Sequence, residues 1–67
     1  MKRLLRIKEV MTATGLSRSS IYKYISLDKF PRPVPIGERA AAWVSDEIES
    51  WIIARVEQRD RTRNDLP

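Results

Sequence analysis

The sequence predicts a mainly α-helical domain with one small antiparallel β-hairpin, and three features of its 67 residues support this fold class. Apolar residues recur at helical spacing in three segments, 7–14, 17–27 and 45–58. A glycine at position 15 separates the first two segments. Before the third segment, prolines at positions 31, 33 and 35 exclude helix, and two short apolar runs flank a turn. We therefore expect three helices and a two- or three-stranded antiparallel wing.

The composition excludes several classes of function. A chain of this length forms at most one domain with a small core. It contains no cysteine and no histidine, so it offers no disulfide, no thiolate metal site and no histidine for acid–base catalysis. The acidic residues Asp46, Glu47 and Glu49 stand at the start of a predicted helix, where the helix dipole favours negative charge. We expect no catalytic residues, no metal and no cofactor.

The N-terminus and the distribution of charge bear on location and partner. Lys2 and Arg3 are followed by only two leucines before Arg6, and no stretch reaches the roughly 18 to 20 apolar residues of a membrane span. We expect a cytoplasmic protein without membrane contact. Residues 1–39 hold nine Lys and Arg against three Asp and Glu, a net charge of +6, whereas residues 40–67 hold four against six, a net charge of −2. This asymmetry is typical of a chain that turns one surface toward a polyanion.

The first two predicted helices are joined by a glycine turn. Gly15 is suited to the left-handed conformation that ends a helix. Ser17 is suited to cap the next helix, because its hydroxyl can accept from the amide of Ser19 or Ser20. The residues expected to face inward are Ile7, Val10, Met11, Thr14, Leu16, Ile21, Tyr24, Ile25 and Leu27. Such a pair is either a plain helical hairpin or a helix-turn-helix, whose second helix enters the major groove of DNA.

The segments around this pair complete the predicted domain. Residues 3–7 favour a short strand or an extended lead-in. Phe30 is expected to pin the proline loop, after which residues 34–36 and 41–44 pair across a turn at 37–39. Trp43, in the second of these strands, is expected in the core, because one large aromatic side chain buries roughly 150 to 250 Å².

The third predicted helix follows directly. Ser45 is expected to be its N-cap, and Trp51 is expected to join the core from its apolar stripe. Beyond Gln58 the sequence is charged and polar without an apolar period. We therefore expect a domain over residues 1–58 and a flexible charged tail over residues 59–67.

The outward face of the second helix carries positive charge and no acid, whereas a merely soluble face usually mixes charges of both signs. The candidate DNA contacts are Arg18, Ser19, Ser20, Tyr22 and Lys23 from this helix and Arg39 from the wing. Cations and serine hydroxyls can bind phosphates or base edges, and a tyrosine ring can stack on a sugar or touch a thymine methyl. For Arg39 a second interpretation stays open, a solvated cation on a hairpin that only covers the core, because the adjacent Glu38 lowers the local charge.

Six segments of the chain resemble the AlpA family of phage-type transcriptional regulators, in the same order and over about residues 4–53. These segments are 5–11, 14–23, 30–34, 37–40, 42–43 and 45–51. The family resembles excisionases and the MerR-type winged helix-turn-helix. The resemblance implies that residues 17–27 are a recognition helix, that residues 35–44 are a wing, and that the partner is double-stranded DNA.

Three functions remain open at this point. The first is a sequence-specific transcriptional regulator of a prophage or integrative element, and the second is an excisionase-like protein that bends DNA and acts with an integrase. The third, of another class, is a protein-interaction adaptor that docks through the helix of Trp51. A single DNA-binding module buries only on the order of 600 to 1,000 Å² of protein surface. We therefore expect a homodimer or cooperative binding to repeated sites.

Overall fold

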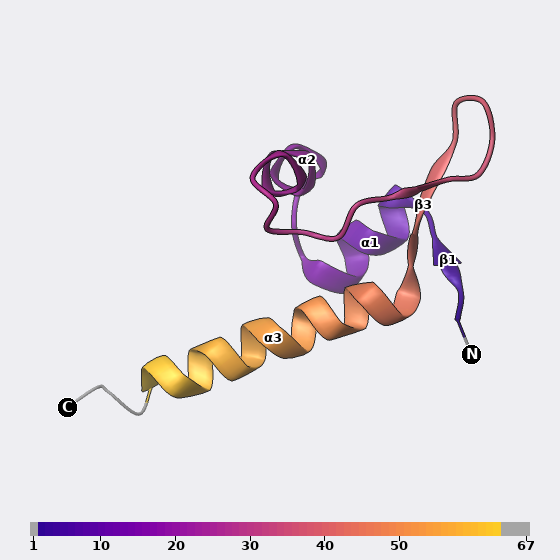
Figure 1. Ribbon diagram of the computed structural model, residues 1–67. Coiled ribbons are helices and arrows are strands. Elements are labelled where there is room, and N and C mark those ends of the chain that lie inside the picture. Colours follow the sequence, from indigo (N-terminus) through magenta and orange to yellow (C-terminus); the bar gives the residue numbers. More distant parts are fainter. Residues whose placement is uncertain (1, 64–67) are drawn as a thin grey trace.

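Three helices and a three-stranded antiparallel sheet make up the structure, a computed structural model that describes residues 2–63. The elements are β1 (Leu4–Leu5), α1 (Ile7–Thr14), α2 (Arg18–Ser26), β2 (Val34–Pro35), β3 (Ala41–Val44) and α3 (Ser45–Arg63). The central strand β3 pairs Leu4 with Val44 on one side and Val34 with Ala42 on the other. Figure 1 shows the loop between β2 and β3 projecting away from the helices. The predicted fold class is confirmed.

The turn between α1 and α2 follows the predicted caps. Gly15 adopts φ 76°, and its amide donates to the carbonyl of Met11 at 2.8 Å. The hydroxyl of Ser17 accepts from the amide of Ser20 at 3.2 Å and so caps α2. Both caps fix the angle at which α2 leaves α1, and this angle decides which side chains of α2 face solvent.

Replacing Gly15 with alanine is expected to lower the free energy of unfolding by about 1 kcal/mol, because an L side chain is strained at positive φ. An added Cβ meets no atom within 4 Å, so the effect isolates backbone strain from crowding. Gly37→Ala is the matched control, since its Cβ meets only the Ala40 Cβ at an ordinary 3.8 Å. Denaturant midpoints measure both, and equal effects would contradict the assignment of strain to Gly15.

The core joins both helices of the turn to β3 and α3. Its buried residues are Val10, Ile21, Phe30, Trp43 and Ile48. The indole N–H of Trp43 donates to the carbonyl of Pro31 at 2.9 Å, and that of Trp51 donates to the carbonyl of Lys29 at 2.8 Å. Phe30 meets Trp51 edge-on, with ring centroids 4.9 Å apart. The two indoles thus hold the start of the proline loop on either side of Phe30. Phe30 and Trp43 are buried as predicted, whereas Trp51, also predicted in the core, is only half-buried.

One residue predicted to face inward does not. Leu27 is 50% exposed, because it is the C-cap of α2 and, at about 100° per residue, lies roughly 120° around the helix from the buried Ile21. The left-handed turn at Asp28 then leads the chain away from α2 into the proline loop.

The start and end of α3 differ from the prediction. Ser45 is the first helical residue rather than the N-cap, and its hydroxyl accepts from the amide of Arg3 at 2.9 Å while its own amide donates to the Arg3 carbonyl at 2.7 Å. It therefore ties the N-terminal strand to α3. The helix continues to Arg63, so the tail expected from residue 59 is helical for five more residues, and residues 64–67 lie outside the described part. Three of these five residues are arginines, which are good helix formers, and adding residues to a helix that is already formed costs far less than starting one.

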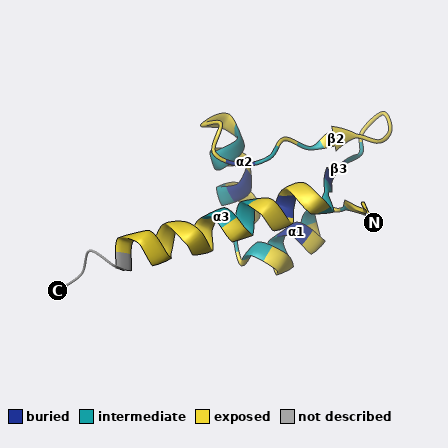
Figure 2. Ribbon diagram, turned by 60° about the horizontal axis from the view of Figure 1, so that its bottom comes forward, coloured by how far each residue is buried: buried dark blue, intermediate teal, exposed yellow. Residues whose placement is uncertain are grey.

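The far part of α3 stands clear of the domain. Every residue from Arg55 to Thr62 is exposed, as the yellow colour of this part of α3 shows in Figure 2. Within residues 2–63, no helix is apolar over a length that could cross a membrane.

Candidate nucleic-acid interface

The solvent-facing side of α2 carries most of the predicted contact residues. Arg18, Ser19, Tyr22 and Lys23 are exposed, whereas Ile21 on the opposite side is fully buried. No acidic residue lies on α2. The helix therefore presents two cations, a hydroxyl and an aromatic ring on one face.

Ser20 is placed differently from the other candidates. It is half-buried, and its hydroxyl lies 2.9 Å from the Ser17 hydroxyl, which donates to it. Ser19 also approaches the Ser17 hydroxyl, at 3.3 Å, but stays exposed. The three serines form one hydrogen-bonded cluster at the start of α2, in which Ser20 is held by the cap and Ser19 faces outward.

Tyr22 is positioned by the sheet. The residue is 49% exposed, and its ring lies 6.4 Å from the Trp43 ring, centroid to centroid, with the planes tilted by 60°. Trp43 belongs to β3, so one aromatic contact connects the exposed face of α2 to the base of the wing. Sequence reasoning did not find this contact, because nothing in the local pattern of either segment indicates which neighbour each ring meets.

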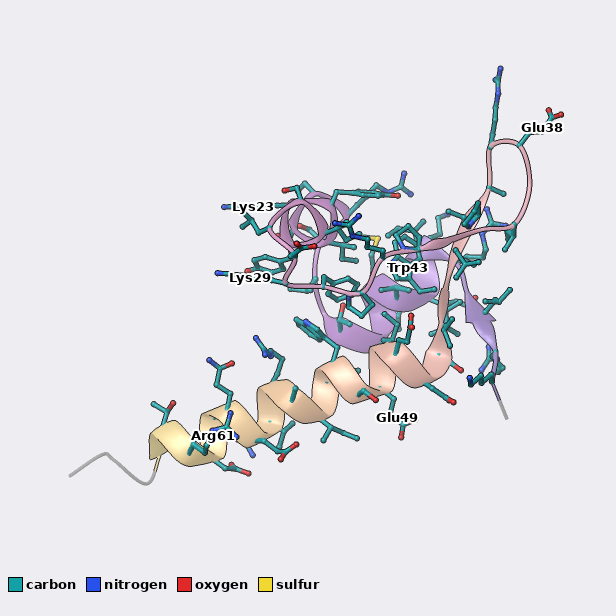
Figure 3. The ribbon with its side chains drawn as sticks, viewed as in Figure 1. Lys23, Lys29, Glu38, Trp43, Glu49 and Arg61 are labelled. Carbon is teal, nitrogen blue, oxygen red and sulfur yellow. The ribbon has the colours of Figure 1, made fainter. Side chains whose placement is uncertain are left out.

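The wing holds Arg39 apart from α2. Beyond β2 and β3, the amide of Ile36 donates to the carbonyl of Ala40 at 2.9 Å and closes the loop that contains Gly37, Glu38 and Arg39. All three of these loop residues are exposed. Figure 3 shows Glu38 at the far end of the loop, away from Trp43 and the core. The structure thus presents Arg39 on a second projection, separate from α2.

The cations of both projections are available to an external anion. The ion pairs within the described residues join Arg3 to Glu9, Arg32 to Asp28 and Arg59 to Asp60. None of them uses Arg18, Lys23 or Arg39. The described residues also contain no group of three or more acidic, histidine or cysteine side chains that could hold a metal ion.

The structure brings together two cations, Lys29 and Arg55, which the sequence did not show to be neighbours. Lys29 follows α2 and Arg55 lies on α3, yet both line the same two adjoining hollows beside Trp51. The Arg55 guanidinium lies 5.3 Å from the centre of the Trp51 ring. No local pattern could have shown this, because the two residues come together only through the packing of Trp51 on the proline loop.

Comparison with known proteins identifies the family of the chain and two of its relatives. The family model described as "Prophage CP4-57 regulatory protein (AlpA)" matches residues 3–56. The protein ORF88 of Enterobacteria phage P4 is 42% identical over 60 residues, which cover 90% of this chain and 68% of that protein. The DNA-binding transcriptional activator AlpA of Escherichia coli is 29% identical over 59 residues, 79% of this chain and 84% of that protein. The chain belongs to the AlpA family of prophage regulatory proteins.

Proposed function

We propose that the chain is a sequence-specific DNA-binding regulator of transcription in a prophage or integrative element. The observation that carries this proposal is the face of α2, where Arg18 and Lys23 are exposed, lie outside the described ion pairs and have no acid on the same helix. The printed description of the Escherichia coli relative as a DNA-binding transcriptional activator supports it. Such a role requires access to phage or chromosomal DNA, hence the cytoplasm.

In this proposal α2 enters the major groove and the wing lies along the backbone or minor groove. An α-helix with its side chains is about 10–12 Å across, and the major groove is about 12 Å wide, so α2 can enter it. Arg18, the first residue of α2, and Tyr22, one turn further along the same exposed edge, read base edges. Ser19, Lys23 and Arg39 bind phosphates. Ser20 acts next to them through the remaining hydrogen-bonding capacity of its hydroxyl.

Replacing Lys23 or Arg39 with alanine is expected to weaken binding to all duplexes alike. A variant that makes one phosphate contact fewer releases about one counterion fewer on binding. The slope of log affinity against log salt therefore becomes less steep by about one unit. Equilibrium titrations of one specific and one random duplex, over a range of salt concentrations, measure both quantities.

Arg61→Ala is the control for these variants. It removes the same charge from an exposed position on the far part of α3, distant from Lys23 and the wing in Figure 3. We expect its salt slope to match that of the parent chain. A drop in slope equal to that of the Lys23 variant would show that net charge, rather than the proposed interface, determines binding.

A single module of this size needs help to select its sites, because its interface is at the lower end for specific protein–DNA complexes. We propose that two or more copies bind together, as a dimer or cooperatively on repeated sites. An integrase is the second partner if the bound sites flank a recombination site instead of a promoter.

A further inference from the structure

The exposed face of α2 has two edges that differ in what lies beside them. At about 100° per residue, Arg18 and Tyr22 fall on one edge and Lys23 on the other. The first edge leads through the contact between Tyr22 and Trp43 to β3 and the wing. The second edge leads to Tyr24, which lines a hollow together with Leu16, Lys29, Trp51 and Arg55. The wing and this hollow therefore flank α2 on opposite sides.

Lys29 is fixed at the second edge by its backbone. Its amide donates to the carbonyl of Tyr24 at 2.8 Å, and its carbonyl accepts from the Trp51 indole at 2.8 Å. The side chain itself is exposed. Figure 3 shows Lys29 and Lys23 extending on the same side of the molecule, away from the wing loop at Glu38. Lys29 thus extends the basic edge of α2 beyond Lys23, and its backbone is held in place by two hydrogen bonds.

Arg55 faces the same hollow from α3. Its guanidinium lies against the Trp51 ring, so its position is restricted although it is exposed. None of the ion pairs within the described residues uses Lys29 or Arg55. The one acid that lines the adjoining hollow is Asp28, and its carboxylate accepts from Arg32 at 2.9 Å. The hollow therefore has two cations to offer to an anion.

We propose that Lys29 and Arg55 bind a phosphate of the DNA backbone that borders the major groove on the side opposite the wing. This inference rests on the proposed function. Two sugar–phosphate strands border a major groove, and a helix held in it is oriented by contacts to both. The wing serves one strand, and the Lys29–Arg55 hollow, next to Lys23, serves the other. Because these contacts touch no base, they set orientation and affinity without changing sequence preference.

The test compares the parent chain with Lys29→Ala, Arg55→Ala and the double variant on one specific duplex. Each single change is expected to lower the salt slope by about one unit, and the double change by about two. Affinity falls severalfold at roughly physiological salt, while the ratio of specific to random binding is unchanged. Arg55→Lys keeps the charge and is expected to keep the slope. Both replaced side chains are exposed, so thermal melting is expected to stay close to that of the parent.

A second arm locates the contact on the DNA. A neutral methylphosphonate placed at single positions along the strand opposite the wing is expected to weaken the parent chain at one position. The double variant is expected to lose nothing further at that position. Arg61→Ala, a matched change on the same helix, is expected to behave as the parent chain does.

The outcomes separate the two proposals. If the parent chain shows no preference for any duplex, the proposed function itself fails. If the parent chain binds specifically and the double variant has the same slope and affinity, the phosphate contact is wrong and the proposed function stands. Loss of transcriptional activation with unchanged DNA binding would also overturn the inference, and would assign the hollow to an acidic protein partner.

Discussion

Alanine in place of Trp43 is expected to leave most of the chain unfolded at 25 °C. Trp43 is 1% exposed, and truncating a buried tryptophan costs about 3–5 kcal/mol. A single hydrophobic core in a chain below about 70 to 80 residues rarely supplies more than about 3–5 kcal/mol, so this loss is comparable to the whole stability of the 67-residue chain. The change also removes the donor that the Pro31 carbonyl accepts from, and the ring against which Tyr22 lies. The proline loop, the wing and α2 therefore lose a shared support.

Circular dichroism during heating measures this effect. Trp43→Phe is expected to lose less, because it keeps an aromatic ring in the core but not the indole N–H. Ile53→Ala is the control from α3, where the side chain is 50% exposed and the expected change is within about 0.5 kcal/mol. A Trp43→Ala chain that melts cooperatively near the parent temperature would contradict the central place given to this residue.

Replacing Arg18 with alanine is expected to relax sequence preference rather than only weaken binding. A cation in good contact with a guanine edge contributes about 1–3 kcal/mol of discrimination, so the ratio of specific to random affinity is expected to fall roughly 5- to 150-fold. Arg18 is exposed at the start of α2, outside every ion pair within the described residues. Its loss therefore leaves the fold intact, and the change in preference reports on base contact.

Competition between a specific and a random duplex measures this ratio directly. Lys23→Ala is the comparison, because a phosphate contact affects both duplexes equally. If Arg18→Ala weakened binding to both duplexes equally, Arg18 would contact the phosphate backbone and not the bases. Tyr22→Ala is expected to relax preference as well, and it tests whether the position set by Trp43 serves base contact.

The parts of the fold that depend on neighbours in sequence could be predicted. The left-handed φ of Gly15 and the hydroxyl cap of Ser17 follow from residue type and from the helices on either side. The two strands of the wing follow from the prolines and the turn at Gly37. The exposed residues of α2 follow from helical period alone, once its start at Arg18 is known.

Contacts between distant segments could not be predicted. Arg3 and Ser45 lie 42 residues apart in the sequence. Ser45 was predicted to cap α3, but its hydrogen bonds to Arg3 link the N-terminal strand to the helix instead. The neighbours of Tyr22 and Arg55 likewise depend on how β3 and α3 pack, which the local pattern of either residue does not contain. The end of α3 was misplaced for another reason: the packed part of the helix acts as a nucleus, and residues 59–63 extend it without needing an apolar stripe.

The central claim is that the face of α2 recognises particular duplex sequences. The most direct measurement is selection of bound fragments from fragmented DNA of the genome that encodes the chain, by the purified protein at roughly physiological salt. We predict enrichment of a few sites near phage or integrase genes, with affinity on the order of a thousandfold or more above random DNA. Sites at a promoter would indicate transcriptional control, and clustered repeats at an attachment site would indicate excision. Equal recovery of all fragments, with binding that disappears as salt rises, would contradict the claim.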